Sequence, residues 1–295
     1  MDKPYETFAR ISIAFINDTF LPLEEAKISP LDRGFLFGDG IYEVIPSYEG
    51  KLVGFKPHID RMNDGLAAIG IQLNWSHQQW QDLCDQLVIE NGSGNLALYL
   101  HVSRGADTSR FHGFPDAVEP TVFAFTFAIA SPPVADKAIV KPYKVSTNRD
   151  LRWERCHIKS TALLGNVLHF QYGYEKGHGE TLLFNGNNEL TEASACNAFI
   201  VKDGRVITPA LDHQKLAGIT RLMLLDILRK DGGIPVEERV VTMDEVADAD
   251  EVWITSSSKE IAPVTEVDGK PVGNGEVGDI WLAAQTLYSA NKYNY

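Results

Sequence analysis

The sequence predicts an α+β fold with two domains. Patterns typical of strands and of helices follow one another along both halves of the 295-residue chain, as they do when helices and strands are mixed within a domain. Between the halves, the run SPPVADKA at 131–138 interrupts all periodicity with two adjacent prolines, which is typical of a linker. We therefore expect a smaller N-terminal domain at 1–132, a linker at 133–138 and a larger C-terminal domain at 139–295, lengths that are ordinary for domains.

The first half is predicted to contain two hairpins, two helices and two further strands. Short apolar runs flank turn residues in the hairpins, and apolar residues recur with helical spacing in the helices. Ser76 is a typical N-cap for the second helix. In chain order we expect hairpins turning at Asn17-Asp18 and Glu49-Gly50, helices within 57–71 and 76–88, and strands within 95–105 and 121–130. The residues expected to face the core are Ile59, Met62, Leu66, Ile69, Trp80, Leu83, Leu87, Leu96, Leu98, Leu100 and Val102.

The second half has the same mixed character and no internal repeat. A helix is expected after Lys159, and another at 220–232 that ends in glycine, as helices often do. The remaining expected elements are a strand near 140–147, a hairpin at 189–209 turning at Asp203-Gly204, a strand at 251–257 that precedes the run APVTEVDGKPV, and a C-terminal helix.

Composition limits the classes of function. The net charge of −13 argues against binding to nucleic acid or to anionic membranes, since both attract basic surfaces. No apolar run approaches the roughly 20 residues of a membrane span, and the opening MDKPYETFAR lacks the apolar core of a signal peptide. Three widely spaced cysteines form neither a disulfide framework nor a zinc pattern. We therefore expect a cytoplasmic protein without a metal site, whose anionic ligands are bound by a few local cations.

Several short motifs contain chemically reactive or polar side chains. The run LDRGFLFGDGIYEV mixes three glycines with phenylalanines, which indicates a tightly folded loop that leads into a strand. PHIDR ends in Arg61, IKS contains Lys159 and LTEASACNAF contains Glu192. LAGITR precedes a predicted helix and ITSSSKE follows a predicted strand. Each motif alone has an ordinary explanation, such as a surface lysine whose amine reaches water, an exposed glutamate or a serine-containing loop.

In their order and spacing these motifs strongly resemble the class IV aminotransferases, which are pyridoxal-phosphate enzymes of fold type IV. The resemblance covers nearly the whole chain. It implies that Lys159 forms the Schiff base with pyridoxal 5'-phosphate and moves the substrate proton, so that its amine is present as a nucleophile. It also implies that Glu192 pairs with the pyridine nitrogen of the cofactor. By the same resemblance, the remaining cofactor-binding residues are Arg61, Leu216, Gly218, Ile219, Thr220, Ser256 and Ser257.

Physical chemistry explains why these residue types suit those roles. The backbone amides of Gly218, Ile219 and Thr220 lie where a predicted helix begins, and unpaired amides at a helix N-terminus attract phosphate. Arg61 would add a charge-assisted fork, and the serines offer hydroxyl groups. Leu216 matches a leucine of the family that packs against the cofactor ring.

The segment SRGADTSRFHGFP indicates which branch of the family the chain resembles. Arg110 and His112 match the Arg-x-His arrangement of the D-amino-acid transaminases, which binds the substrate carboxylate together with a tyrosine that matches Tyr42; Val44 is the fourth expected substrate residue. The resemblance thus implies transamination of D-amino acids, such as D-alanine and D-glutamate, with pyruvate or 2-oxoglutarate. It also implies a homodimer whose subunits share the active site. An (R)-selective amine transaminase, a branched-chain aminotransferase and an aminodeoxychorismate lyase have the same fold and remain alternatives.

Overall fold

The computed structural model describes residues 12–295, so the prediction made for the opening MDKPYETFAR concerns a segment outside the described part. The chain divides into two compact units. The first contains the residues up to Ser131 together with Ile158–Leu163 and Tyr295, and the second contains Pro132–His157 and Leu164–Asn294. The residues predicted as a linker, 133–138, lie at the start of the second unit and form no helix or strand.

The first unit is built on a sheet with the strand order β2-β1-β6-β5-β3-β4 in the described residues. All of its pairings are antiparallel, and the turns at Asn17-Asp18 and Glu49-Gly50 have positive φ, which confirms both predicted hairpins. Its elements are β1 (Ile13–Ile16), β2 (Thr19–Pro22), α1 (Arg33–Phe37), β3 (Gly40–Tyr48), β4 (Lys51–Leu52), α2 (Phe55–Ala68), α3 (His77–Asn91), β5 (Leu96–Ser103) and β6 (Thr121–Ala128).

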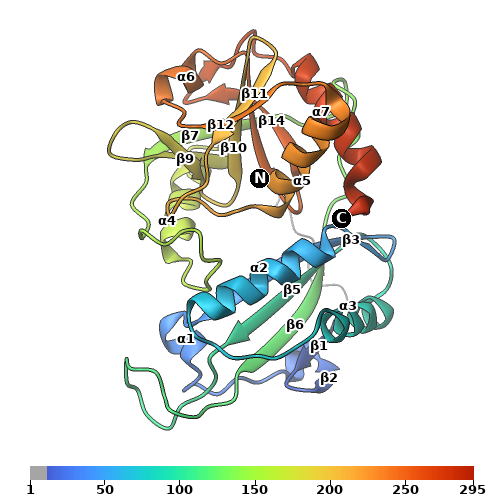
Figure 1. The fold of residues 1–295 in the computed structure, drawn as a ribbon, viewed down its shortest axis with the longest axis vertical. Coiled ribbons are helices and arrows are strands. Elements are labelled where there is room, and N and C mark those ends of the chain that lie inside the picture. Colours follow the sequence, from blue (N-terminus) through green and yellow to red (C-terminus); the bar gives the residue numbers. More distant parts are fainter. Residues whose placement is uncertain (1–11) are drawn as a thin grey trace. The chain divides into compact units, whose positions relative to one another are not determined.

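Helices α2 and α3 cover one face of this sheet (Figure 1). Ser76 caps α3 through a capping box with Gln79, so the predicted start of this helix is confirmed. Every residue expected to face the core is buried, except Ile69 and Leu96, which lie at the ends of their elements and are half-buried. The apolar side chains between sheet and helices form one continuous core that also includes Ile158.

The second unit contains a larger mixed sheet with the order β12-β11-β10-β13-β14-β7-β8-β9, to which β15 pairs through β14. Its elements are β7 (Tyr143–Arg149), α4 (Leu164–Tyr174), β8 (Glu180–Phe184), β9 (Leu190–Ala193), β10 (Asn197–Lys202), β11 (Arg205–Pro209), α5 (Ile219–Ile227) with a π-helical extension (Leu228–Gly232), β12 (Val236–Arg239), α6 (Met243–Ala247), β13 (Glu251–Ser256), β14 (Glu260–Val267), β15 (Lys270–Pro271) and α7 (Asp279–Asn291).

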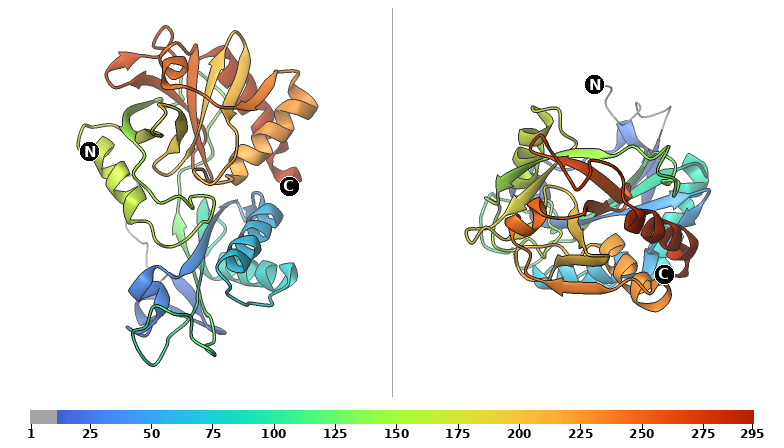
Figure 2. Two further views of the ribbon diagram at one scale, coloured as in Figure 1. Left: turned by 60° about the vertical axis from the view of Figure 1, so that its left-hand side comes forward. Right: turned by 90° about the horizontal axis from the view of Figure 1, so that it is seen from above.

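This larger sheet is strongly curved, because β9 at one end contacts β10 and β11 near the other. Helices α5 and α7 pack together against β13 and β14, whereas α4 lies against β7 and β8, as the two views in Figure 2 show. Buried aliphatic side chains of the strands form its core.

Three features of the chain path differ from the simplest interpretation of the sequence. The predicted hairpin at 189–209 contains two separate strands before its turn, since the chain bends at Ser194–Cys196 between β9 and β10. The helix expected after Lys159 begins only at Leu164. Residues 158–163 belong to the first unit, because their backbone pairs with β3 instead of forming a helical turn.

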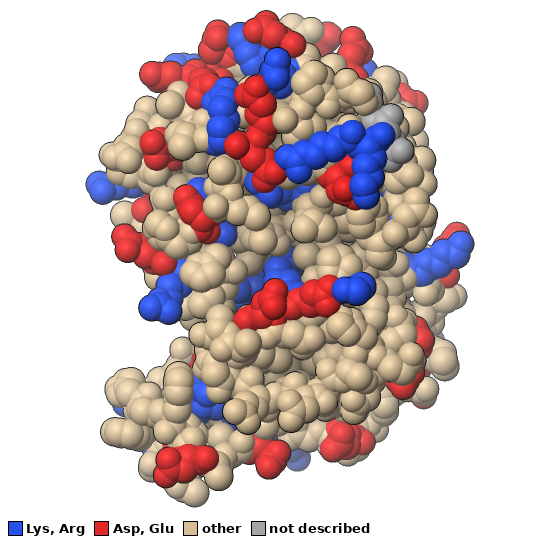
Figure 3. Space-filling model, in the orientation of Figure 1, with Lys and Arg blue, Asp and Glu red and all other residues tan. Residues whose placement is uncertain are grey.

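Acidic and basic side chains are interspersed on the face of the molecule shown in Figure 3. In the described residues, no helix combines the length and the apolar character that crossing a membrane requires.

Candidate active site

The segment that contains Lys159 runs along β3 in the first unit. The Tyr42 amide donates to Lys159 O at 3.2 Å, and the Thr161 amide donates to Gly40 O at 3.0 Å. Gly38 permits this close approach: it has a φ of 66°, and a Cβ atom there would lie 2.9 Å from Ala162. The half-buried Lys159 places Nζ 4.1 Å from the ring centroid of Tyr42. The glycine-rich loop predicted from the sequence therefore allows the chain to hold the lysine beside the start of β3.

Arg61 on α2 forms a forked ion pair with a buried glutamate, Glu43 on β3. Arg61 Nε donates to Glu43 Oε1 and Nη2 donates to Oε2, both at 2.7 Å. Burial alone would raise the pKa of Glu43, but Arg61, assisted by His58, lowers it to about 2. The carboxylate is therefore ionised at neutral pH and fixes the plane of the guanidinium. Sequence reasoning identified Arg61 but missed Glu43.

His58 lies on the same helix face and completes this cluster. Its Nδ1 is 2.7 Å from Glu43 Oε2, and the imidazole is buried. Burial lowers the pKa of His58, although the Glu43 carboxylate opposes that change. The ring is therefore neutral at neutral pH, and because an ionised carboxylate only accepts hydrogen bonds, Nδ1 must bear the proton.

Arg110 and His112 lie in the irregular segment between β5 and β6, with both side chains exposed. Phe37 at the end of α1 brings them together: the Arg110 guanidinium carbon is 5.2 Å from the ring centroid of Phe37, and the His112 ring centroid is also 5.2 Å from it. The other two predicted substrate residues, Tyr42 and Val44, are half-buried and share one face of β3.

Glu192 on β9 is a buried carboxylate of the second unit. It accepts hydrogen bonds from Arg152 Nη1 at 2.6 Å, from Asn197 Nδ2 at 3.0 Å and from the Leu216 amide at 3.1 Å. Burial raises the pKa of Glu192, and the charge of Arg152 offsets only part of that effect. A further hydrogen-bond donor would stabilise the ionised form of a buried carboxylate whose pKa is raised in this way.

Arg152 is itself oriented by a second carboxylate. Its Nε and Nη2 donate to Asp150 at 3.0 and 2.7 Å. Burial would raise the pKa of Asp150, but Arg152 outweighs burial and lowers it. The guanidinium is therefore held between two carboxylates, which fixes where Glu192 lies. Asp150, Arg152 and Asn197 are site residues that sequence reasoning missed.

The first backbone amide at the start of α5, that of Gly218, donates to Leu216 O at 2.9 Å. The N-cap of the helix, Gly218, supplies no side-chain cap, and the first intrahelical bond found there is from Leu222 N to Gly218 O. A Cβ atom at Gly218 would overlap with Asn197 Oδ1, so a larger residue there would have to displace the Asn197 side chain. Ile219 and Thr220 follow and are buried. An uncapped helix start with its dipole is suited to bind phosphate.

The remaining predicted residues of this unit are Leu216, Ser256 and Ser257. Leu216 is half-buried, and its carbonyl accepts from Asn197 Nδ2 at 2.8 Å, so Asn197 joins it to Glu192. Ser256 and Ser257 are half-buried where β13 turns into β14, and Ser256 Oγ accepts from the Lys259 amide at 3.3 Å.

These residues suit pyridoxal phosphate. A carboxylate has about four acceptor positions, and Glu192 uses three of them within the described residues, which leaves one for a protonated ring nitrogen. In the second unit the uncapped start of α5 suits a phosphate group, and in the first unit the Arg61 guanidinium suits an anion. Lys159 supplies an amine beside an aromatic ring.

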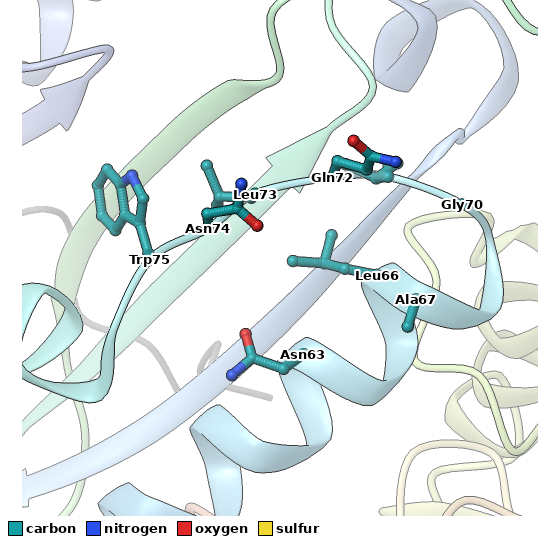
Figure 4. Close-up of a pocket in the computed structure, with 9 residues that line it drawn as sticks. Asn63, Leu66, Ala67, Gly70, Gln72, Leu73, Asn74 and Trp75 are labelled. Atoms are coloured by element: carbon teal, nitrogen blue, oxygen red, sulfur yellow. The ribbon is translucent and has the colours of Figure 1, made fainter.

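A surface pocket of about 490 Å³ lies elsewhere in the first unit, between the end of α2 and the segment 71–75 (Figure 4). Amides of Asn63, Gln72 and Asn74 face it together with apolar side chains such as Leu66 and Trp75. It contains no titratable or nucleophilic side chain and none of the predicted site residues.

Comparison with known proteins identifies the family. The model of the family described as "Amino-transferase class IV" matches residues 40–267. The chain is 38% identical to the D-alanine aminotransferase of Listeria monocytogenes serotype 1/2a (strain 10403S) over 265 residues, which cover 90% of this chain and 91% of that protein. It is also 38% identical to the D-alanine aminotransferase of Staphylococcus aureus (strain COL), over 90% of this chain and 93% of the relative.

Solved structures agree with this assignment at the level of the fold. A branched-chain amino acid aminotransferase solved with pyridoxamine 5'-phosphate has a TM-score of 0.88 at 23% identity, covering 97% of this chain and 95% of that one. The branched-chain enzyme of Escherichia coli has a TM-score of 0.85 at 21% identity, covering 96% and 95%. The chain thus belongs to the class IV aminotransferases, enzymes of fold type IV that depend on pyridoxal phosphate.

Proposed function

We propose that this chain transfers amino groups between D-amino acids, such as D-alanine and D-glutamate, and 2-oxo acids, such as pyruvate and 2-oxoglutarate. The observation that carries the proposal is the placement of Arg110 and His112 on one ring, in a chain 38% identical to D-alanine aminotransferases over 90% of its length. A guanidinium next to an imidazole suits a carboxylate, because both donate hydrogen bonds and the guanidinium is always charged.

Residues of the first unit handle the amino group and the proton. Pyridoxal phosphate supplies an electron sink that makes the proton on the substrate Cα removable. Lys159 Nζ binds the cofactor and, once released, removes that proton and returns it. Arg61, held by Glu43, binds the phosphate. Glu43 is ionised beside Arg61, whereas His58 is neutral because burial and the nearby cations Arg61 and Lys159 lower its pKa. Glu43 is therefore the negative charge among these four side chains.

Residues of the second unit hold the cofactor ring and its phosphate. Glu192 keeps the ring nitrogen protonated, because an ionised carboxylate favours a positive partner. Leu216 packs against the ring. The amides of Gly218, Ile219 and Thr220 and the hydroxyl groups of Ser256 and Ser257 bind the phosphate.

The substrate residues decide the stereochemistry. Lys159 would reach the substrate Cα from one side only, so the orientation of the substrate would determine which enantiomer is formed. Arg110, His112 and Tyr42 fix that orientation through the carboxylate, and Val44 lies on the same strand face as Tyr42.

We also propose a homodimer in which the segment with Arg110 and His112 contributes to the partner's site. An apolar stripe on α4 supports a subunit contact: Leu164, Val167 and Leu168 are 70%, 56% and 62% exposed and lie on one helix face. Stripes of this kind mark protein interfaces. We place the protein in the cytoplasm, because Cys84, Cys156 and Cys196 are all free thiols.

The proposed activity is tested by assaying D-alanine and L-alanine separately with 2-oxoglutarate and following pyruvate. We expect D-alanine to react much faster. Equal rates or a preference for L-alanine would contradict the proposal and place the chain in another branch of the family. Equally fast conversion of an (R)-amine without a carboxylate would indicate an amine transaminase. Release of pyruvate from aminodeoxychorismate without an amino acceptor would indicate a lyase.

A further inference from the structure

Two buried arginines of the first unit share one carboxylate. Arg33 at the start of α1 and Arg104 after β5 each donate from Nε to Asp39 Oδ2 at 2.8 Å, and Arg104 Nη2 donates to Asp39 Oδ1 at 3.0 Å. Their side chains are only 3% and 7% exposed, and that of Asp39 is 11% exposed. Burial would raise the pKa of Asp39, but the two arginines together lower it. The cluster therefore contains two positive charges and one negative charge.

The excess positive charge is directed at backbone carbonyl groups. Arg33 Nη1 donates to Phe111 O at 2.6 Å, and Nη2 donates to His112 O at 3.3 Å. Arg104 donates to Ile69 O at 2.6 Å and to Gly70 O at 3.1 Å. A buried guanidinium requires acceptors for its remaining N–H groups. Arg33 thus binds the backbone at 111–112. Arg104 binds the backbone just after α2, where Gly70 appears in Figure 4.

Side chains of the same segment also rest on this cluster. The ring of Phe114 lies 3.6 Å from the guanidinium carbon of Arg104. Phe37, one helical turn after Arg33, contacts Arg33 at 4.9 Å as well as Arg110 and His112. Both proposed substrate-binding side chains are therefore supported by a ring on the helix that provides Arg33.

This arrangement explains how two exposed side chains in an irregular segment can keep a fixed geometry. Arg110 and His112 are exposed and belong to no helix or strand, so by themselves they would lose conformational freedom on binding a carboxylate. The backbone next to them is already bound to buried charges. A carboxylate site that is held in advance loses less free energy when the substrate binds.

We propose that Arg33 and Arg104, joined by Asp39, are positioning residues that hold Arg110 and His112 in place for the substrate carboxylate, with Phe37 as their support. The proposal rests on the proposed function, because it takes Arg110 and His112 to be the carboxylate-binding residues. It assigns no contact with substrate or cofactor to Arg33, Asp39 or Arg104. Their effect should appear in substrate binding and in the order of the segment.

The test uses the holoenzyme with Arg33→Lys, which keeps the charge but cannot reach Asp39 and two carbonyl groups at once. Arg205→Lys is the matched control, since Arg205 is half-exposed and pairs with Glu237 on the surface. We expect Arg33→Lys to raise KM for D-alanine about 10- to 100-fold with little change in kcat, because a misplaced binding group weakens ground state and transition state alike. Trypsin should also cut after Arg110 faster than in the wild type and the control.

Phe37→Leu provides a second variant that does not alter the buried charges. It should raise KM in the same way, and it decides the question if Arg33→Lys yields no folded holoenzyme. Unchanged KM together with unchanged cleavage after Arg110 would overturn the proposal, as would a fall in kcat at unchanged KM. If the wild-type enzyme does not convert D-alanine, the proposed function fails; faster cleavage of the variants then still supports positioning of the segment, and unchanged cleavage overturns it.

Discussion

Replacing Glu43 by glutamine tests whether the buried ion pair with Arg61 stabilises the first unit. Glu43 is fully buried and accepts hydrogen bonds from Nε and Nη2 of Arg61 and from Nδ1 of His58. Glutamine has nearly the same volume but no charge, so the change removes the ionic contribution while leaving the packing almost intact. It also leaves the Arg61 guanidinium, whose side chain is 13% exposed, beside a neutral amide.

The size of the effect follows from the pKa of Glu43, which lies at about 2 instead of 4.5. That difference corresponds to about 3 kcal/mol of stability, comparable with the cost of breaking other buried pairs. Since the pKa is lower in the folded state, this stability is fully present above pH 4.5 and is lost as the pH falls toward 2. Glu43→Gln should therefore lower the free energy of unfolding by about 3 kcal/mol at pH 7, with a smaller difference from wild type at more acidic pH.

Urea unfolding of the apoprotein measures this effect without a contribution from bound cofactor. The matched control is Asp60→Asn, the next position before Arg61 on α2, where a carboxylate that is 43% exposed pairs with Lys56 and His77. An exposed pair contributes less than about 1 kcal/mol. Equal unfolding midpoints for Glu43→Gln and Asp60→Asn, or a difference from wild type that grows on acidification, would refute this reasoning.

Three further outcomes are expected. Borohydride reduction of the holoenzyme should attach the pyridoxyl group to the peptide containing Lys159, and Lys159→Ala should abolish turnover without unfolding the protein; a label on another lysine would exclude the assignment. Arg61→Lys should lose pyridoxal phosphate faster on dialysis, because an ammonium group cannot reproduce the forked pair with Glu43 and also bind the phosphate, and equal retention would argue against a phosphate role. Leu168→Glu should lower the mass measured by light scattering toward one chain, whereas an unchanged dimer would exclude the α4 stripe as the subunit contact.

Local features of the fold could be predicted from the sequence because they depend on neighbouring residues. The turns at Asn17-Asp18, Glu49-Gly50 and Asp203-Gly204 all have positive φ at both central positions, and Asn, Asp and Gly tolerate that conformation best. The period-two alternation in β5 distinguishes buried from half-buried side chains along most of the strand. What could not be predicted is long-range pairing, such as the parallel pairing of β7 with both β8 and β14, or the return of 158–163 to β3.

Some of the site residues that were not predicted have a recognisable pattern in the sequence, and others have none. Glu43 could have been found: it alternates with Ile41 and Ile45 in the buried phase of β3, and a glutamate there requires a charged partner. Arg61 and His58 are spaced to share a helix face, so the pair could have been proposed. Asp150 and Arg152 lie where β7 has ended, in irregular backbone without periodicity. Nothing in the sequence indicates that Arg152 reaches Glu192.

In each unit, a charged side chain proposed to bind the cofactor is oriented by a buried side chain of opposite charge. In the first unit the cation proposed to bind phosphate, Arg61, is oriented by a buried carboxylate. In the second the carboxylate proposed to bind the ring, Glu192, is oriented by a buried arginine. Each charge therefore has a buried partner of opposite sign within its own unit, which lowers the cost of burying it. Binding then adds one more partner to groups whose positions are already fixed, and in a chain with a net charge of −13 such local arrangements, not the overall field, must attract an anionic cofactor.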